Sequence, residues 1–337
     1  MIHVSTFSIC LLIVVSSCNG LRIQSKKTMP TLERLPSIPS NELGEGPHWD
    51  VQCQSLFFVD IFGKSIHKYV PATKRHTQAD IGIDFVSFII PISGYKDKFI
   101  ISIGRQLAVV TWNGESKNVS NLEYIAKIEN NTETLENSFN DAKCDPVGRL
   151  WAGTMGELLP GGDIAPEKGA LYRYDNGYLN MQVNKVGISN GLAWRSDGKK
   201  MYYVDTQKET VDQFDYDIIT GKISNRKILF TVRKHNIPGR PDGMTIDSDN
   251  NLWVAMFTGG RILKISTQKP ESLLQVYHIP AKQVTSVTFG GPKLQDLYVT
   301  TGKISLHGEV LNPPENGGTF RITGLGITGT PGVSVRL

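Results

Sequence analysis

The sequence has few cysteines, and this scarcity excludes a disulfide-based fold. Of four cysteines in 337 residues, Cys10 and Cys18 fall in an apolar N-terminal segment, which leaves only Cys53 and Cys144. Two cysteines cannot form the framework of bridges that holds small secreted domains together, and the sequence leaves their pairing open. Cys-x-x-Cys and His-x-His spacings are also missing, so the spacing indicates no zinc or redox site. The fold must therefore be stabilised by burial of apolar side chains.

Long hydrophobic runs are missing everywhere except at the N-terminus. Residues 1–20 form a short apolar run that ends in small residues near Gly20, which is typical of a secretory signal, although no Lys or Arg precedes it. An uncleaved anchor is the alternative. No later stretch approaches the roughly 20 apolar residues that a membrane helix needs. We expect cleavage near Gly20 and a secreted protein without a membrane partner, which makes the sequons at Asn118 and Asn130 candidate glycosylation sites.

Clustered positive charge is absent as well. The chain has 36 Lys and Arg residues against 32 Asp and Glu, a formal net charge of +4, but the basic residues are scattered along the sequence. A nucleic-acid-binding surface would need a basic stripe with aromatic side chains between the charges. We therefore expect no nucleic-acid partner. We also expect a monomer.

Convincing long amphipathic helices are missing too, and a repeat of about fifty residues takes their place. A small residue, an alternating strand, a polar turn and an aromatic-rich strand recur from starts at 46, 87, 141, 191, 243 and 286. Each copy continues with two more short strands between Gly, Asp, Asn and Pro turns. Four strands per repeat of this length are the signature of propeller blades. The sequence thus predicts an all-β fold, a six-bladed β-propeller of four-stranded antiparallel blades, with a β-sandwich array as the alternative.

The repeat also predicts the domain boundaries. We expect a signal peptide over residues 1–20, an N-terminal extension over 21–34 and a single propeller domain over 35–337. The segment 35–43 precedes the first repeat, so we expect it to supply the outer strand of the last blade. Such a strand would close the ring and remove its open sheet edges.

The residue immediately before each repeat start has a side chain with an oxygen donor in most copies. Four of the six positions hold a carboxylate or an amide, namely Glu45, Asn140, Asn190 and Asp242, whereas the other two hold Val86 and Thr285. Equivalent positions in a propeller lie at one height around the axis, so these four side chains should converge. Converging carboxylates need a cation, and hard oxygen donors favour Ca²⁺, Mg²⁺ or Mn²⁺. We expect one divalent cation on the axis; the alternative is that these are ordinary turn residues.

Two other patterns compete with this interpretation. The stretch 187–191 reads Gly-Ile-Ser-Asn-Gly and matches the G-x-S-x-G elbow, which would make Ser189 a nucleophile. That elbow needs a helix after the turn, whereas a strand, a turn and a second strand follow here. Asp242 and His278 come next in the order of a hydrolase triad, but only their order supports them. We therefore favour Asn190. The stretch 247–251 imitates an EF-hand loop without its Gly or its helices, so we expect a hairpin turn.

Several ordered phrases resemble one known family. They include "GEGPHWD", "ISNGLAWRSDGKKMYYVD", "PDGMTIDSDNNLWVA" and "GGTFRITGLGITG". From about Leu43 to the C-terminus, the chain resembles the regucalcin family, also called the senescence marker protein 30 or gluconolactonase-like family. "SFIIPI" and "HKYVP" are most similar to its insect branch, which includes luciferin-regenerating enzyme. The resemblance implies a six-bladed propeller with one catalytic divalent cation, and hydrolysis of lactones or esters.

By motif, the resemblance implies roles for individual residues. Glu45, Asn190 and Asp242 fall on the metal ligands of the family, and Asn140 falls on a position that contacts the substrate. Calcium is the expected ion, with zinc, manganese or magnesium as alternatives. Asp242 would also be the general base, since it is a ligand with a free oxygen. Asp141 would support the site through hydrogen bonds.

The same comparison shows where the substrate pocket departs from the family. Ser138 stands where the family usually has an Arg that would hold a polyhydroxylated substrate. Leu158 stands at the acidic substrate contact of the family, with Glu157 one residue away, and Arg240 is a further candidate for a substrate contact. This pattern disfavours gluconolactone as the substrate.

We therefore expect a secreted, divalent-metal-dependent lactonase- or esterase-like hydrolase with an altered substrate pocket and a small lactone or ester as its partner. Two alternatives stay open. One is a propeller that binds calcium or a small ligand without turnover, and the other is an activity like that of luciferin-regenerating enzyme.

Overall fold

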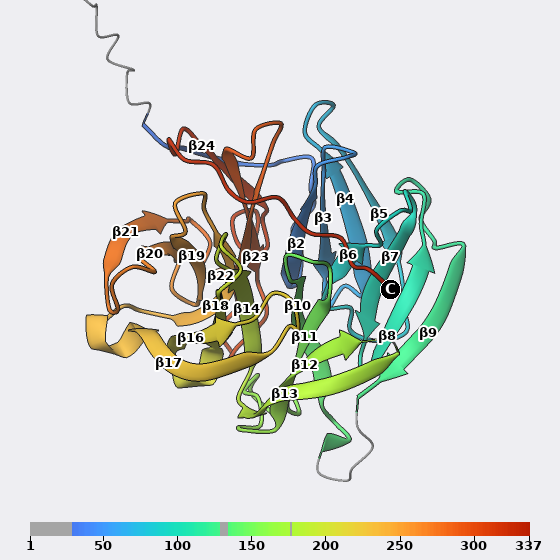
Figure 1. Cartoon of the computed structure of the whole chain (residues 1–337). Coiled ribbons are helices and arrows are strands. Elements are labelled where there is room, and N and C mark those ends of the chain that lie inside the picture. The colour runs from blue at the N-terminus through green and yellow to red at the C-terminus, as the bar shows by residue number, and fades with distance from the viewer. Residues whose placement is uncertain (1–28, 129–133, 176) are drawn as a thin grey trace, which may run out of the picture.

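The protein is a ring of six four-stranded antiparallel sheets in the computed structural model, which describes residues 29–128, 134–175 and 177–337 (Figure 1). The predicted six-bladed propeller is therefore confirmed. The expected signal at residues 1–20 and the sequon at Asn130 lie outside the described residues. Within these ranges, no helix is both long enough and apolar enough to cross a membrane.

The blades follow one another in chain order, and the first strand of each blade lies nearest the axis. The inner strands are β2 (Gly44–Asp50), β6 (Ile89–Pro91), β10 (Ser138–Cys144), β14 (Ser189–Trp194), β18 (Arg240–Ile246) and β22 (Gln283–Gly290). The second strands are β3 (Ser55–Asp60), β7 (Lys98–Ile103), β11 (Leu150–Met155), β15 (Lys200–Asp205), β19 (Leu252–Phe257) and β23 (Asp296–Gly302). The third strands are β4 (Ser65–Val70), β8 (Gln106–Thr111), β12 (Gly169–Asp175), β16 (Thr210–Tyr216), β20 (Arg261–Ile265) and β24 (Phe320–Thr323).

The outer strands are the most exposed. They are β5 (Arg75–Asp80), β9 (Asn121–Lys127), β13 (Tyr178–Val186), β17 (Ile223–Thr231), β21 (Leu273–His278) and, in the sixth blade, β1 (Thr31–Arg34). Short 3₁₀ helices follow two strands of the fourth blade: η2 (Thr206–Lys208) follows β15, and η3 (Val232–His235) follows β17. Every residue of β14 and of β22 is buried, whereas β9 and β21 contain no fully buried residue. Burial thus decreases from the axis outwards.

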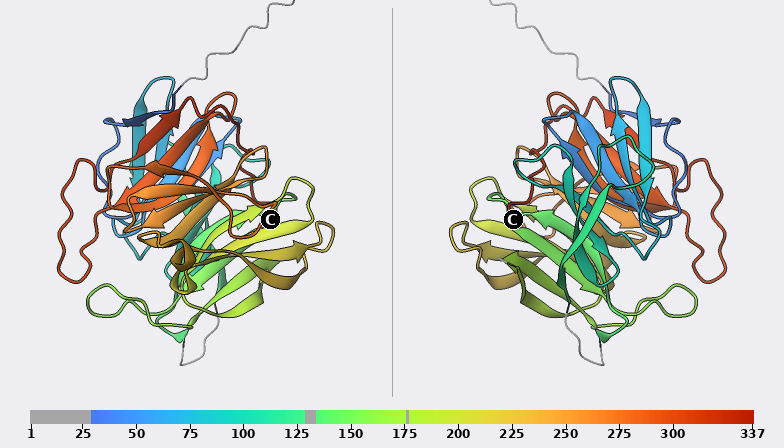
Figure 2. Two further views of the ribbon diagram at one scale, coloured as in Figure 1. Left: turned by 90° about the vertical axis from the view of Figure 1, so that its left-hand side faces the viewer. Right: turned by 90° about the vertical axis from the view of Figure 1, so that its right-hand side faces the viewer.

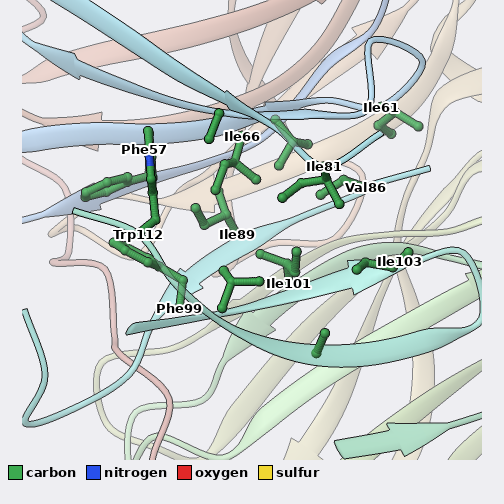
Figure 3. Packing of buried hydrophobic residues seen from close by; sticks show 14 residues of the cluster. Phe57, Ile61, Ile66, Ile81, Val86, Ile89, Phe99, Ile101, Ile103 and Trp112 are labelled. Atoms are coloured by element: carbon green, nitrogen blue, oxygen red, sulfur yellow. The ribbon is translucent and has the colours of Figure 1, made fainter. Parts of the chain in front are cut away.

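Apolar side chains fill the spaces between neighbouring blades. Figure 3 shows one such cluster between the first two blades, where Phe57 and Ile66 face Ile89, Phe99 and Ile101. Burying a large apolar side chain contributes about 1.5–3 kcal/mol. Each blade is therefore held by its neighbours as well as by its own hydrogen bonds.

The aromatic side chains that recur with the repeat belong to this core. Trp151 and Trp253 are completely buried, and Trp194 is almost so. Each of the first two donates its indole N–H to an aspartate at the preceding turn: Trp151 to Asp145 and Trp253 to Asp247. The stretch 247–251 is the hairpin turn expected from the sequence, closed by the bond from Asp247 N–H to the Asn251 carbonyl.

The ring closes with a different segment from the one we expected. Strand β1 pairs antiparallel with β24, from Thr31 opposite Thr323 to Arg34 opposite Phe320. The expected segment, 35–43, instead leads from this outer edge inwards to β2. Pro36 and Pro39 have no N–H to donate to a strand partner, which explains why the sheet uses the residues before them. The prediction for 35–43 was wrong, and the propeller begins within the expected N-terminal extension.

The C-terminal segment covers one face of the ring (Figure 1). Thr328 accepts a hydrogen bond from Ser248 of the fifth blade, and Val335 pairs with Ile92 of the second blade. Arg336 N–H donates to the Gly148 carbonyl of the third blade. These contacts lie at the C-terminal ends of the inner strands, so the face with the N-terminal ends of the inner strands carries the site described below.

Both remaining cysteines are free: Cys53 is exposed and Cys144 is buried. Asn118 lies in the exposed turn between β8 and β9. This position suits a glycosylated asparagine, and its occupancy stays a prediction.

Candidate metal centre

A local irregularity of the inner strands aims the predicted ligands. In β10, pairing with β11 shifts between Phe139 and Ala142; in β14 and β18 the same shift brackets Asn190 and Asp242. Such a bulge places two residues opposite one and redirects their side chains. The ligand positions in β10, β14 and β18 are therefore bulge positions, whereas the shift in β2 begins after Glu45.

Glycine follows the ligand position where neighbouring inner strands meet. A Cβ on Gly191 would lie 2.5 Å from the Cβ of Met244, and one on Gly243 would lie 2.0 Å from the Oγ of Ser286. Neither space can hold a side chain. Gly46, after Glu45, has a positive φ of 53°, which glycine adopts without steric cost. The small residues of the repeat thus let the inner strands come close together.

One cavity of about 740 Å³ gathers the four predicted donors. Glu45, Asn140, Asn190 and Asp242 all line it, although they come from four different blades. Of the two remaining equivalent positions, Thr285 is completely buried and donates its hydroxyl to the Gly44 carbonyl. The structure therefore brings together the residues that the repeat singled out.

The amide of Asn190 is oriented by its neighbours. Thr206 donates its hydroxyl to the Pro241 carbonyl at 2.8 Å, so toward Asn190 the same oxygen can only accept. The atom of Asn190 that lies 2.8 Å from this oxygen must then be the amide nitrogen, Nδ2. This leaves Oδ1, which is buried and has no hydrogen-bond partner within the described residues. A buried oxygen without a donor is costly, and a cation would satisfy it.

The two carboxylates at the site repel each other. Burial raises the pKa of Glu45 to about 8; the charge of Asp141 adds to this, and the bond from Gly46 N–H opposes it. Burial also raises the pKa of Asp242 well above its ordinary value, helped by the charges of Glu45 and Asp141. Ionised carboxylates in this place need a positive charge. Together with the free amide oxygen, they fit a hard divalent cation.

This donor set differs from the usual metal clusters. In the parts of the chain that the structure describes, no three His, Cys, Asp or Glu side chains gather as a metal site. The candidate centre depends instead on an amide oxygen between blades. Ligation by Glu45, Asn190 and Asp242 stays a prediction that this geometry supports.

Asn140 is oriented in the same manner as Asn190. Its Nδ2 donates to the Ser189 carbonyl at 2.9 Å, so its Oδ1 is the atom left to meet a ligand of the cavity. Ser189 itself is completely buried and accepts a hydrogen bond from the Tyr203 hydroxyl at 2.7 Å. This serine cannot reach a substrate, and the G-x-S-x-G interpretation is excluded.

The other predicted substrate contacts lie in different places. Ser138 and Arg240 line the cavity, whereas Asp141 is buried outside its lining and bonds to Ala142 N–H. Glu157 is exposed and outside the lining, so a substrate contact by this residue stays a prediction without geometric support. Leu158, next to it, does line the cavity.

Apolar side chains that the sequence did not reveal form much of the wall. They are Phe62, Phe85, Ile164, Ile188, Phe257 and Leu306. Most belong to loops between strands, where no alternation of polar and apolar residues tells which side chain faces a cavity.

Two long loops meet over the cavity. The loop 156–168 belongs to the third blade and the loop 303–319 to the sixth, which stand opposite each other in the ring. His307 N–H donates to the Gly161 carbonyl at 2.9 Å, and the ring of His307 lies 3.6 Å from Asp163. Figure 2 shows both loops projecting side by side from the same face. Asp163 and His307 of this bridge line the same cavity as the four donors.

Comparison with known proteins agrees with these features. The chain matches the SMP-30/Gluconolactonase/LRE-like region over residues 43–303. It is 37% identical to regucalcin from Danio rerio and 36% identical to regucalcin from Homo sapiens, over 86% and 87% of this chain and 94% of each relative.

Solved structures give the same result. A luciferin-regenerating enzyme superposes with a TM-score of 0.87 at 45% identity, over 92% of this chain and all of the other. Regucalcin from Agrobacterium tumefaciens, described as a calcium-binding protein, superposes with a TM-score of 0.77 at 25% identity, over 90% and 97%. With its propeller, its ordered motifs and these relatives, the chain belongs to the SMP-30/gluconolactonase/LRE-like family, the regucalcin family.

Proposed function

We propose that this protein is a divalent-metal-dependent hydrolase of lactones or esters. The observation that carries the proposal is the unpartnered Oδ1 of Asn190, buried in the wall of the cavity that the carboxylates of Glu45 and Asp242 also line. Membership of the family supports a lactonase-type propeller. The ion, the substrate and secretion are parts of this proposal.

Calcium is the ion we propose, because two carboxylates and an amide offer only oxygen donors. Magnesium, manganese and zinc are the alternatives. Glu45, Asn190 and Asp242 would hold the ion, and the description of the Agrobacterium tumefaciens relative as calcium-binding is consistent with this choice. When bound, a divalent cation polarises a carbonyl and lowers the pKa of a water molecule.

The chain supplies the remaining parts of the reaction. Asp242 would accept the proton of the attacking water through its second carboxylate oxygen. Thr206 keeps the amide of Asn190 in one orientation, and the Ser189 carbonyl does the same for Asn140. The Oδ1 of Asn140 would accept a hydrogen bond from a hydroxyl of the substrate or from water. Both amides are set before the substrate arrives, which reduces the cost of ordering the site.

The walls of the cavity favour an apolar substrate. Leu158, Phe62, Phe85 and Phe257 line it, and Ser138 is too short to form the fork of hydrogen bonds that an Arg gives to a sugar. A polyhydroxylated lactone would leave several hydroxyls against apolar carbon, where each unpaired group costs about 1–3 kcal/mol. We propose an aryl or alkyl lactone or ester as the substrate.

A substrate panel tests the proposal. Purified protein with calcium, manganese or zinc is offered gluconolactone, dihydrocoumarin and phenyl acetate, and its metal content is measured before any addition. We expect turnover of the aryl substrates, loss of activity on chelation, and weak or no turnover of gluconolactone. Clear metal binding without turnover of any substrate would instead support a binding propeller.

Secretion and assembly state need their own measurements. Expression of the full chain in insect cells should release a protein whose N-terminus begins near residue 21, and size-exclusion chromatography should give a monomer. An N-terminus at Met1 in the cell fraction would contradict the proposed signal.

The relative at 45% identity favours a second candidate function, that of a luciferin-regenerating enzyme. This activity would use the same cavity. Recovery of light emission when the protein is added to a spent firefly luciferase reaction would support it, and a variant with Asp242 changed to Ala should fail in the same assay.

A further inference from the structure

One arginine in the cavity lining has no partner for its charge. Arg240 is the exposed first residue of β18, two residues before the buried Asp242, and both line the cavity. Because the site lies at the N-terminal ends of the inner strands, Arg240 stands on the solvent side of Asp242. Within the described residues, its guanidinium makes no hydrogen bond, ion pair or cation–π contact. The group is therefore available to a ligand that enters the cavity.

The pairing of β18 with β19 turns this side chain toward the cavity. Arg240 lies opposite Phe257, and Pro241 lies opposite Met256. Residues that lie opposite each other point to the same face of a sheet, and the next pair points to the other face. Phe257 lines the cavity, whereas Met256 is completely buried in the core between the fourth and fifth blades. Arg240 therefore shares the face of Phe257, on the side of the cavity.

The acidic side chains of the lining do not neutralise this arginine. The two carboxylates of the metal centre belong to the proposed ion. Glu309, on the loop of the neighbouring sixth blade, forms an ion pair with Lys282, whose Nζ lies 2.5 Å from Oε2. The remaining acids of the lining come from parts of the chain around the second and third blades, neither of which adjoins the fifth: Asp84, Glu136 and Asp163. Arg105, the other arginine of the lining, lies in the second blade and already has an interaction partner.

The surroundings of Arg240 indicate which ligand it would meet. Phe257 lies beside it, and most other large side chains of the lining are apolar. Arg240 and Asp242 are two residues apart in a strand, which corresponds to roughly 7 Å. A benzene ring with substituents at opposite ends bridges a similar distance. An anion at Arg240 and an ester bond at the metal centre can thus belong to one substrate with an aromatic ring between them.

We propose that Arg240 is a specificity-determining residue, which selects aryl esters or lactones with a carboxylate at the opposite end of the ring from the bond that is hydrolysed. This inference rests on the proposed function and narrows its substrate class to anionic compounds. The guanidinium would hold the carboxylate through two parallel N–H···O bonds, a geometry that lysine does not offer. In the reaction, water adds to the acyl carbon and the C–O bond breaks, while the carboxylate at Arg240 takes no part.

Hydrolysis of three acetates by the full chain with calcium, manganese or zinc tests this selection. The substrates are para-acetoxybenzoate, phenyl acetate and para-acetoxyphenyltrimethylammonium, which are anionic, neutral and cationic. Arg240→Met removes the charge and keeps most of the length, whereas Arg240→Lys keeps the charge without the fork. Arg75→Met, at an exposed position on β5 outside the cavity, is the matched control. Each variant is compared with the wild type on each ester, so that differences in intrinsic reactivity cancel, and thermal melting checks that it folds.

Each variant has a distinct expected result. Arg240→Met should lower kcat/KM for para-acetoxybenzoate by about tenfold or more relative to phenyl acetate, because a charge-assisted pair is lost. KM should carry most of this change, since the contact is the same before and during the reaction. The cationic ester should gain relative to phenyl acetate, and Arg240→Lys should give intermediate ratios. The loss should be smaller for ortho-acetoxybenzoate, whose carboxylate lies next to the ester. Arg75→Met should keep the wild-type ratios.

The possible failures are distinguishable. Turnover with the same ratios in Arg240→Met as in the wild type would overturn the role of Arg240 and leave the hydrolase standing. This includes a preference for the anion that survives in the variant, since the carboxylate would then be bound elsewhere.

A wild type that hydrolyses none of the esters would overturn the proposed hydrolase, and a binding measurement then decides on Arg240. Calorimetry compares para-hydroxybenzoate with phenol on the wild type and on Arg240→Met. Binding of para-hydroxybenzoate that is about tenfold weaker in the variant, relative to phenol, would support the anion site. Equal binding, or no binding to the wild type, would overturn it.

Discussion

At the residue scale, the site depends on amides whose orientation is fixed by neighbouring hydrogen-bond partners. Thr206 is one such group: it accepts from Asn190 Nδ2 because its own proton goes to the Pro241 carbonyl. Residues that orient a ligand in this way commonly contribute about 10–100-fold to metal affinity.

We therefore expect Thr206→Val to weaken calcium binding by about tenfold, because the amide of Asn190 could then rotate. Calorimetric titration measures the change. Thr206→Ser keeps the hydroxyl and is the matched control, which should bind nearly as the wild type does. Equal affinities for the valine and serine variants would show that Asn190 is held by other contacts.

Asp242 combines the roles of metal ligand and base in the proposed reaction. Asp242→Ala should lose both bound metal and activity, and Asp242→Asn should lower turnover by about 10²–10⁴-fold through loss of the base. Metal analysis and steady-state kinetics measure the two effects separately. Glu123→Gln, a change at an exposed position on the outer strand β9, is the control and should leave both unchanged.

The stability of the metal-free protein should increase when one of the two carboxylates is removed, although metal binding and activity decrease. Without metal, the charges of Asp242 and Glu45 are buried close together, which raises the pKa of both. Removing one of them should raise the melting temperature of the chelated protein, because repulsion in the folded state is lost. A lower melting temperature for chelated Asp242→Asn would mean that this carboxylate stabilises the fold even without an ion.

At the scale of elements, the pair β4 and β5 contains a chain of neutral histidines. His67 bonds to Ser65 at 2.8 Å and to His76 at 2.9 Å, and Phe58 stacks on His67. Burial lowers the pKa of His67 from 6.5 to about 3, with the charge of His76 adding to this, and burial lowers that of His76 from 6.5 to about 4.

These shifts predict acid sensitivity of the first blade. The unfolded chain takes up protons below about pH 6.5, whereas the folded chain does so only near pH 3–4. The stabilisation is therefore complete above pH 6.5 and is lost as the pH falls toward 4. His76→Gln should flatten the decline of the melting temperature between pH 7 and 5. His278→Gln, at an exposed position on β21, is the control and should keep the decline.

The sequence predicted the elements better than their connections. The repeat located the inner strands and the ligand positions because one bulge recurs at equivalent places in several blades. It misplaced the closing strand because Pro36 and Pro39 lie in the segment that seemed to precede the first blade. The residue types at positions 31–34 gave no sign of a β-strand. The partner of this strand, β24, is nearly three hundred residues away in the chain.

The site also contains some residues that the sequence predicted and others that it did not. Glu45 and Asp242 could be found because each repeats a pattern, whereas the aromatic wall comes from loops that have no repeat.

At the scale of the whole molecule, two segments hold the ring together. Strand β1 joins the two ends of the chain within one blade, and the C-terminal segment crosses the face opposite the cavity. The C-terminal segment contacts the second, third and fifth blades and so connects sheets that do not pair with one another. Val335, completely buried, packs among the side chains of the second and third blades.

Removal of residues 326–337 should therefore loosen the ring while leaving every blade its four strands. We expect a lower melting temperature and faster proteolysis, since Val335→Ala alone removes a buried side chain at a cost of about 1–3 kcal/mol. The donors of the metal centre lie around the axis, so looser blades should also weaken calcium binding. Removing only the exposed Leu337 is the control. A truncated protein with unchanged melting and unchanged affinity would show that sheet closure by β1 suffices to keep the four donors together.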